Sequence, residues 1–584
     1  MKNLLLSTLL IVTMALPALS QMTSQQREFD FDVLASLYAK RYGPANWKLQ
    51  ALGVNIFDLR AWKARVRAAK SDLEYYEIAS EYVASFQDGH STYRLPSNFF
   101  ADLGIAVDIY EGKVLLEAWN SAIYPRADFP FALGDELVSL DGKPVSEWID
   151  TFAKYRGFGN PRAARRLAAE QLTFRSQSVN PRAHEIGDTS EAEFIDAAGE
   201  RKKYTLKWTK TGTPITQSSP VPSPFSAQRA SAQQEMMKPL EDLRNWAVPE
   251  TDLLLARRLF EQEDGEVLEK SFVLGYGARN PYYQLPPNFQ IRLGRLASDI
   301  FYSGTYSYEG LRIGYLRIPN FSPTSAAAAL AQLDAEMTFF KANTDGLVID
   351  VSRNTGGGCI GLDYAQRLLP EQFYFFGEQL RPTQSLLISY SNSLRIAELL
   401  RADTWVIETY KFIVSELESA LKANRAMTGP LPACTSVAPG PIVAPTLNNL
   451  PLRAPDGSLV AYTKPIIFLA DEFSVSFGDI FPAMMQDNRR GPIVGMRTGG
   501  LGGSISSWPA GFFSEATSSN TNSLVLRRDN IVTSEFPTAP YIENIGVRPD
   551  IQLDYMTREN LVRRGAPFVD AFSKIIVEEI RKKQ

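Results

Sequence analysis

Ser476 stands at a position where a serine can act as a nucleophile. It lies in the segment Asp471–Asp479 (DEFSVSFGD), between an apolar run that predicts a buried strand, residues 466–470, and a predicted helix, residues 479–487. The N-terminus of a helix has free backbone N–H groups and positive potential, which favour an oxyanion. A serine at such a corner can also simply cap the helix, and this segment alone favours the cap.

A glycine-rich loop, residues 354–358 (NTGGG), follows a second predicted buried strand, residues 346–351. Because glycine has no Cβ, such a loop lets the backbone approach a ligand closely and can present N–H donors to an oxyanion. A phosphate-binding loop would end in Gly-Lys followed by Ser or Thr, and this ending is missing. A plain turn is the remaining alternative.

The sequence contains only two histidines, His90 and His184. His90 directly follows Gly89, which is expected to end the last helix of a helical region, residues 25–87. An imidazole has an ordinary pKa of about 6.5, so it can accept the proton of a serine near neutral pH. The two histidines lie in different contexts and the two cysteines have no ligand company, so neither a metal site nor another cofactor is expected.

The elements that must position these residues change character along the chain. Alternating apolar residues and a turn predict a hairpin over residues 105–116, an Asp-Gly turn follows at residues 141–142, and residues 203–208 predict a closing strand. Beyond residue 311, predicted strands alternate with predicted helices, which is typical of an α/β core. The strands are residues 313–318, 346–351 and 466–470, and the helices are residues 326–341, 479–487 and one beginning at Tyr364.

The ends and insertions of the chain carry further signals. Lys2, an apolar run over residues 4–17 and small residues at Ala18 and Ser20 predict a signal peptide, residues 1–20, and hence a secreted or periplasmic protein without a stable membrane span. An insertion over residues 378–463, with a predicted helix at residues 404–423, is typical of a lid or cap.

Two global properties limit the partners and the redox chemistry. The net charge is −4, and no basic face is indicated, so no nucleic-acid partner is expected. Cys359 and Cys434 can pair in an oxidising compartment, or each can stay free.

Six segments, in their order along the chain, resemble the tail-specific, C-terminal-processing serine peptidase family, and more closely its tricorn-core branch. They are residues 88–91 (DGHS), 134–137 (GDEL), 313–318 (IGYLRI), 354–358 (NTGGG), 474–479 (SVSFGD) with 486–488 (QDN), and 543–550 (ENIGVRPD). The resemblance covers most of the chain. It implies an α/β multidomain fold with an N-terminal helical bundle, a PDZ-like β-rich domain and a crotonase-like α/β peptidase core.

The resemblance implies a role for each residue at the serine. The family's nucleophile is the serine three residues before an acid, which matches Ser476 before Asp479. Its oxyanion donors match Gly357, with Gly358 beside it, and Phe477, although the family usually has a small residue where Phe477 stands.

The resemblance also implies which residue acts as the base. One branch uses a lysine, but Leu501 occupies that position here, so a Ser–Lys mechanism is not expected. The tricorn-like branch uses a histidine from the N-terminal helices, which matches His90, and a supporting acid, which matches Glu543. That branch can have a serine directly before the histidine, where this chain has Gly89.

These observations predict a serine endopeptidase that acts on polypeptides held by the PDZ-like domain. A chain of 584 residues is too long for one core, and the expected parts are listed by residue: 1–20 signal peptide, 21–98 helical domain, 99–212 PDZ-like domain, 213–303 linker or insertion, 304–575 peptidase core. The alternative is a catalytically silent protein of the same fold that binds a ligand or peptide. The oligomeric state is left open.

Overall fold

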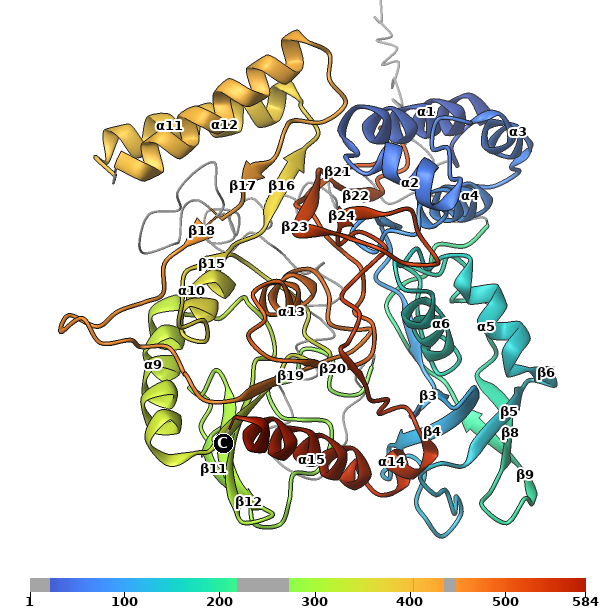
Figure 1. The fold of residues 1–584 in the computed structure, drawn as a ribbon. Coiled ribbons are helices and arrows are strands. Elements are labelled where there is room, and N and C mark those ends of the chain that lie inside the picture. Colours follow the sequence, from blue (N-terminus) through green and yellow to red (C-terminus); the bar gives the residue numbers. More distant parts are fainter. Residues whose placement is uncertain (1–20, 218–272, 403, 435–447, 584) are drawn as a thin grey trace, which may run out of the picture.

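The computed structural model describes residues 21–217, 273–402, 404–434 and 448–583. Helices near the N-terminus, a small β-rich domain and a larger α/β domain lie side by side (Figure 1). The predicted α/β multidomain fold is confirmed. The predicted signal peptide and much of the predicted linker, residues 213–303, lie outside the described residues.

Four helices form the N-terminal part: α1 (Ser24–Arg41), α2 (Ala45–Leu52), α3 (Arg60–Ala68) and α4 (Asp72–Ala84). Thr23 and Gln26 form a capping box at the start of α1, and Ser71 caps α4. Aromatic side chains fill the space between the helices; the rings of Tyr38 and Tyr82 both pack edge-on against Phe86. α4 ends at Ala84, so the expectation that Gly89 ends this helix is wrong.

The small domain is built on one antiparallel sheet. Its strands are β3 (Ile105–Tyr110), β4 (Lys113–Trp119), β5 (Glu136–Leu140), β6 (Lys143–Pro144), β8 (Thr189–Ile195) and β9 (Arg201–Lys207). The Asp141-Gly142 turn joins β5 to β6 with positive φ at both residues, 54° and 73°, as a tight hairpin requires. Two helices, α5 (Val145–Ala153) and α6 (Pro161–Glu170), and a second sheet of β2 (Phe100–Asp102), β7 (Phe174–Ser176) and β10 (Thr209–Thr211) complete it.

A seven-stranded sheet forms the centre of the large domain. Its order is β11 (Gln290–Leu293), β12 (Tyr302–Tyr308), β13 (Leu311–Arg317), β14 (Gly346–Asp350), β19 (Ile466–Ala470), β20 (Ile493–Gly495) and β25 (Ile551–Gln552). The pairs from β13 to β25 are parallel, and the parallel strands are continuous apolar runs because both faces of the sheet are covered.

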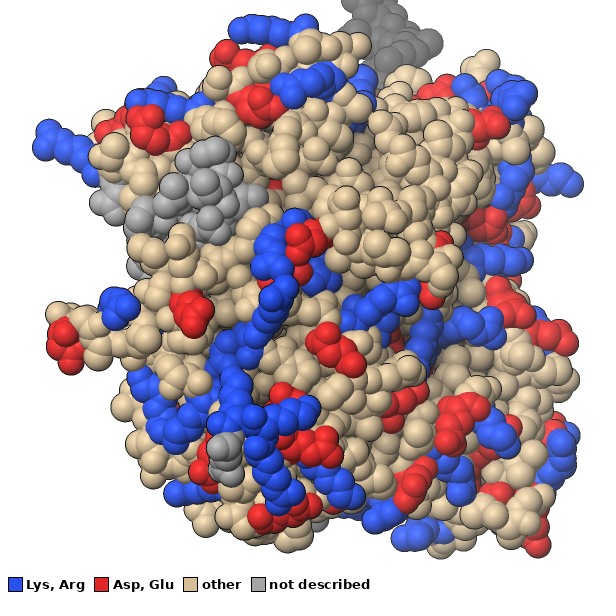
Figure 2. Space-filling model, viewed as in Figure 1, with Lys and Arg blue, Asp and Glu red and all other residues tan. Residues whose placement is uncertain are grey.

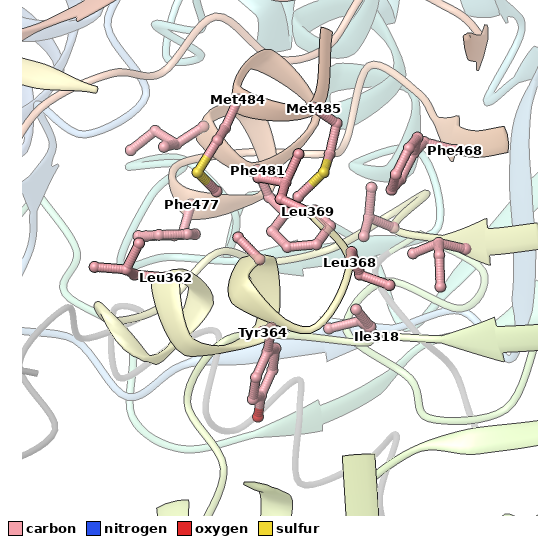
Figure 3. Close-up of a cluster of buried hydrophobic side chains, with 14 of the residues drawn as sticks. Ile318, Leu362, Tyr364, Leu368, Leu369, Phe468, Phe477, Phe481, Met484 and Met485 are labelled. Carbon is pink, nitrogen blue, oxygen red and sulfur yellow. The ribbon is translucent and has the colours of Figure 1, made fainter. Parts of the chain in front are cut away.

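Helices cover the two faces of this sheet. Leu347 and Ile349 of β14 pack toward α9 (Ala326–Asn343), α10 (Ile360–Gln366) and α13 (Phe477–Asp487), and Figure 3 shows part of this cluster. Val348, between them, packs on the opposite face toward α15 (Ala566–Lys582), which follows α14 (Arg558–Val562). α10 begins four residues before Tyr364, directly after the glycine loop, so its predicted start is too late.

The insertion forms a projecting helical hairpin of α11 (Gln384–Leu399) and α12 (Thr404–Lys422) (Figure 1). The sequence predicted only the second helix; α11 buries only Ala397 and therefore lacks a clear apolar stripe. At its base, β16 (Gly377–Leu380) and β17 (Leu431–Pro432) join β23 (Ser523–Ile531) and β24 (Ala539–Tyr541) in one sheet. Beside it, β15 (Phe373–Tyr374) pairs with β18 (Asn448–Asn449).

A disulfide joins Cys359 to Cys434 and ties the chain just after β17 to the start of α10. The sequence left open whether these cysteines pair. The bridge joins two residues that are 75 positions apart in the sequence, so it reduces the number of conformations open to the unfolded chain.

Replacing Cys434 with serine is therefore expected to lower the free energy of unfolding by about 2–5 kcal/mol. Urea unfolding of oxidised wild type, oxidised Cys434→Ser and reduced wild type measures this. The reduced wild type should match the variant; an unchanged unfolding midpoint after reduction would contradict the prediction.

The charged side chains of one face are shown in Figure 2. Basic side chains form a band that runs upward from the region of α15, and acidic side chains lie beside it along its length. The two signs of charge are thus mixed in this view.

Candidate active site

Ser476 lies at the sharp corner between β19 and α13. Its backbone has φ 57° and ψ −120°, a region that non-glycine residues rarely adopt and that is found at strained functional sites. The corner is held from both sides, because Val475 N–H donates to the Asn354 carbonyl (3.0 Å) and Asp479 N–H donates to the Ser476 carbonyl (2.9 Å). Ser476 stands at the N-cap position of α13, but its side chain forms no capping hydrogen bond. The alternative that this serine simply caps the helix is therefore not supported.

The glycine loop lies against this serine. Gly356 has φ +82°, and a Cβ added there would lie 2.5 Å from Ser476 Cβ and 3.1 Å from Ser476 Oγ. Only glycine fits this contact without moving the serine. Gly357, with φ +136°, is also a position that L side chains rarely adopt.

The backbone amides of the loop differ in what they bind. Gly356 N–H donates to Asn354 Oδ1 (2.8 Å), and Gly358 N–H donates to the Phe321 carbonyl (2.8 Å). Within the described part of the chain, no acceptor is found for the N–H groups of Gly357 and Phe477. Gly358, one of the predicted oxyanion donors, is thus already engaged, whereas the amides of Gly357 and Phe477 have no acceptor among the residues that the structure describes.

Phe477 fits beside Ser476 because the neighbouring helix leaves room for its ring. A Cβ added to Gly361 in α10 would lie 2.0 Å from the Phe477 ring, and the ring packs 4.9 Å from that of Phe321. Figure 3 shows Phe477 in the apolar cluster between α10 and α13. The unusual size of this residue is therefore matched by a glycine opposite it.

The loop after α4 carries His90 toward the core. Gln87 has φ 50° and turns the chain, and Gly89 follows where a Cβ would lie 2.8 Å from the Leu501 side chain and 2.9 Å from that of Phe158. The glycine thus packs closely against the Leu501 and Phe158 side chains and does not end a helix. Leu501 is the residue at which the resemblance predicted that a lysine base is missing.

β1 (Tyr93–Arg94), directly after this loop, pairs with β22 (Thr517–Thr521), which also pairs with β21 (Ile505–Pro509). Ser519 Oγ donates to the His90 carbonyl (2.6 Å), and Thr521 Oγ1 donates to Asp88 Oδ2 (2.7 Å). The helical part and the core are therefore joined by strand pairing and side-chain hydrogen bonds at His90.

The surroundings of the His90 ring determine its protonation. Burial lowers the pKa of His90 below its ordinary value; Asp88 opposes this shift and Lys48 adds to it. Burial alone would raise the pKa of Asp88, but Lys48 and His90, together with the Thr521 hydrogen bond, hold it below its ordinary value. In the described residues, His90 Nδ1 is buried without a partner, and no hydrogen bond joins the His90 ring to Ser476.

Glu543 is fully buried, and its carboxylate is shared between two partners. One oxygen forms an ion pair with Lys48 of α2, and the other accepts from Gly502 N–H (3.2 Å). Burial raises the pKa of Glu543 to about 8, with the Asp88 charge adding to the rise and Lys48 opposing it. The predicted supporting acid thus lies beside the loop of His90, paired with a lysine.

The segment Gly499–Gly502 connects these parts. Asp479, in the first turn of α13, accepts from Gly500 N–H (2.9 Å) and Leu501 N–H (3.1 Å), and it also accepts from Thr498. Burial raises the pKa of Asp479 to about 7, although these hydrogen bonds act in the opposite direction. One segment thus contacts the helix that begins after Ser476, the Glu543 loop and Gly89.

Sequence reasoning missed Asp88 and Lys48 as members of this cluster. Asp88 could have been found from the local sequence, because a carboxylate two residues before a histidine can accept a hydrogen bond from the histidine's backbone amide. Asp88 Oδ1 accepts from His90 N–H (2.9 Å). Lys48 had no signal, because its partners lie far along the chain. The described residues contain no group of three or more His, Cys, Asp or Glu side chains suited to a metal, and no helix among them is long and apolar enough for a membrane span.

Comparison with known families places two domains on this chain. Residues 312–553 match the model described as peptidase family S41, and residues 100–215 match a model described as a PDZ domain. The resemblance to a serine peptidase family that the motifs predicted is confirmed by these matches.

Individual relatives match over most of their length. A Chlamydia pneumoniae protein is 23% identical over 608 residues, which covers 94% of this chain and 90% of the relative. A Chlamydia trachomatis protein is 22% identical over 586 residues, which covers 94% of this chain and 92% of that relative. Among solved structures, mature CPAF complexed with lactacystin has a TM-score of 0.70 at 20% identity, covering 96% of this chain and 99% of that chain. These likenesses show a shared fold.

Proposed function

Since the chain carries a serine-type peptidase domain of family S41 preceded by a PDZ domain, we propose that it is an exported endopeptidase with Ser476 as nucleophile and His90 as general base. The observation that carries the proposal is the corner at Ser476, where a strained serine lies in contact with a glycine loop. Such strain is typical of a serine that is exposed to substrate at a strand-to-helix turn.

The free amides at this corner supply the oxyanion site in the proposed reaction. Ser476 Oγ attacks the peptide carbonyl, and the N–H groups of Gly357 and Phe477 stabilise the negative charge that forms on the carbonyl oxygen. Gly358 is left out of this role because its amide already donates to Phe321.

Gly356→Ala is expected to lower kcat/KM by about 10²-fold, because a Cβ would push the nucleophile out of line. Gly310→Ala is the matched control: Gly310 has φ +81° against +82° for Gly356, but nothing lies within 4 Å of its added Cβ. Both variants carry the same backbone strain, so equal loss of peptidase activity in the two would contradict contact with Ser476 as the cause.

His90 acts in the proposal as the acceptor of the Ser476 proton. A lowered pKa supports this role, because the ring is then neutral at neutral pH. Catalytic hydrogen bonds often shorten only when substrate binds, so the pair can be completed in the complex. Asp88, whose pKa is held below its ordinary value, is the carboxylate proposed to stabilise the imidazolium that forms. Glu543 is proposed to support His90 through Lys48, with which it is paired.

The PDZ domain is proposed to hold the polypeptide substrate. β3 is an end strand of its sheet, so an extended peptide can add to it by main-chain hydrogen bonds. The Cys359–Cys434 disulfide supports export, because such bonds persist in oxidising compartments, and it agrees with the signal peptide that the sequence predicts.

A fluorophosphonate label followed by peptide mapping tests the function directly. The reagent reacts with activated serines, so modification is expected at Ser476 and is expected to stop hydrolysis of an unfolded polypeptide. Absence of labelling, with no hydrolysis of such a polypeptide, would favour the alternative of a catalytically silent binding protein.

A further inference from the structure

Lys48 in α2 is a buried lysine whose ammonium group is fully used. Its side chain is 0% exposed, and Nζ donates to the Gln87 carbonyl (3.0 Å), to Asn544 Oδ1 (2.7 Å) and to Glu543 Oε1. Three N–H donors therefore meet three acceptors. A buried charge with this many well-placed partners holds those partners in fixed positions.

On the side of the N-terminal helices, Lys48 donates to the backbone carbonyl of Gln87, where the chain turns toward His90. Gln87 lies three residues before His90, and its φ of 50° depends on support from the surroundings. Asn544 Nδ2 donates to the same Gln87 carbonyl (2.9 Å), so this carbonyl is held by two donors, one from the helical part and one from the core.

The acceptors on the core side continue toward the nucleophile. Glu543 Oε2 accepts from Gly502 N–H (3.2 Å), and Asn544 N–H donates to the Gly500 carbonyl (2.9 Å). Gly500 in turn donates to Asp479 in the helix that begins directly after Ser476. A continuous set of hydrogen bonds thus runs from the nucleophile's helix through Lys48 to the histidine loop.

The charges around this lysine come from several elements. Asp88 and His90 face it from the loop after α4, Glu543 faces it from the loop after β24, and Tyr42 at the end of α1 faces both carboxylates. A positive charge here disfavours the protonated form of His90, whereas Asp88 favours it. The charge of Lys48 therefore lowers the pKa of the His90 ring, and its hydrogen bond to the Gln87 carbonyl holds the loop that carries His90.

We propose that Lys48 is a positioning residue for His90: by holding the Gln87 carbonyl it fixes the histidine loop on the core, so that the imidazole can accept the Ser476 proton. This inference rests on the proposed function and deepens it. Lys48 does not touch the reacting atoms; it acts through the Gln87 carbonyl and through its charge.

Lys48→Met is expected to lower kcat by about 10²-fold and to change KM little, because the base is displaced while the peptide-holding domain is untouched. Arg27→Met is the matched control. It breaks another buried ion pair of the same helices, Arg27–Asp72 (3.3 Å), that lies outside the His90 loop, so it should lower the melting temperature and leave the kcat of the folded protein unchanged.

A second readout measures the charge effect on the ring. The chain has only two histidines, so NMR titration of the imidazole signals, assigned with His184→Gln, reports the pKa of His90 directly. We expect this pKa, and the acid limb of the pH–rate profile, to rise by about one pH unit in Lys48→Met. Lys48→Arg, which keeps the charge, should restore the wild-type pKa.

The outcomes separate this inference from the function on which it rests. An unchanged His90 pKa and an unchanged kcat in folded Lys48→Met would overturn the positioning role, while fluorophosphonate labelling of Ser476 in the wild type would still support the peptidase. If Lys48→Met does not fold, Asn544→Gly is compatible with the φ of 61° at this position, removes the second donor to the Gln87 carbonyl together with the Oδ1 acceptor of Lys48, and leaves the lysine charge in place. It should lower kcat, and wild-type kcat in it would count against the inference.

Discussion

Ser476→Ala is expected to abolish peptide hydrolysis, with a loss in kcat on the order of 10⁶-fold, as for loss of a triad nucleophile. The fold should be retained, because in the described residues no side-chain hydrogen bond of Ser476 supports the structure and the corner is held by backbone contacts of its neighbours. Turnover of an unfolded polypeptide, with a melting curve alongside, measures both expectations.

Ser474→Ala is the matched control for this variant. Ser474 Oγ donates to the Val351 carbonyl (2.8 Å) and accepts from Asp471 N–H (3.0 Å), so this serine supports the structure. Its replacement should lower the melting temperature and leave substantial activity in the folded protein. If Ser476→Ala kept wild-type turnover and Ser474→Ala lost it, the nucleophile would be reassigned.

His90→Ala is expected to lower kcat by about 10⁴-fold or more and to remove the acid limb of the pH–rate profile. A base must be unprotonated to act, and burial places the pKa of His90 below its ordinary value of 6.5. In the wild type, kcat/KM should therefore rise with pH through a midpoint below 6.5 and stay level above it. Initial rates between about pH 4 and pH 9 measure the profile.

His184→Ala is the control for this prediction. The His184 ring contacts Gln177 Nε2 through Nδ1 (2.9 Å), both residues of the small β-rich domain, so its loss should leave the acid limb in place. A profile that still rises steeply above about pH 9 would indicate a lysine as the base and would contradict the histidine mechanism.

The sequence predicted the fold best where a local pattern determines the structure. The apolar runs of β14 and β19, the helix after Ser476 and the Asp141-Gly142 turn all follow from periodicity or turn chemistry within a few residues. The start of α10 and the end of α4 were misplaced by several residues, because tertiary contacts and not local preference set these ends.

The candidate site was only partly predictable, since its chemistry depends on contacts between distant segments. Family motifs pointed to Ser476, His90 and Glu543, but no pattern pairs Lys48 with Glu543 across 495 residues. Nor does a run of three glycines reveal that the Gly358 amide donates to Phe321 while the Gly357 amide has no acceptor among the described residues. Such assignments follow from which partner already fills each hydrogen-bonding group.

The distribution of the site along the chain also orders events in time. His90 is synthesised early, whereas Thr521 and Glu543, which hold its loop or its lysine partner, follow roughly 430 to 450 residues later. At typical synthesis rates of about 5–20 residues per second, that delay is on the order of half a minute to a minute and a half. On the proposed mechanism, an unfinished chain that already contains both Ser476 and His90 lacks the contacts to Asp88 and Lys48 that hold the histidine loop, so we expect a nascent or truncated product to be inactive.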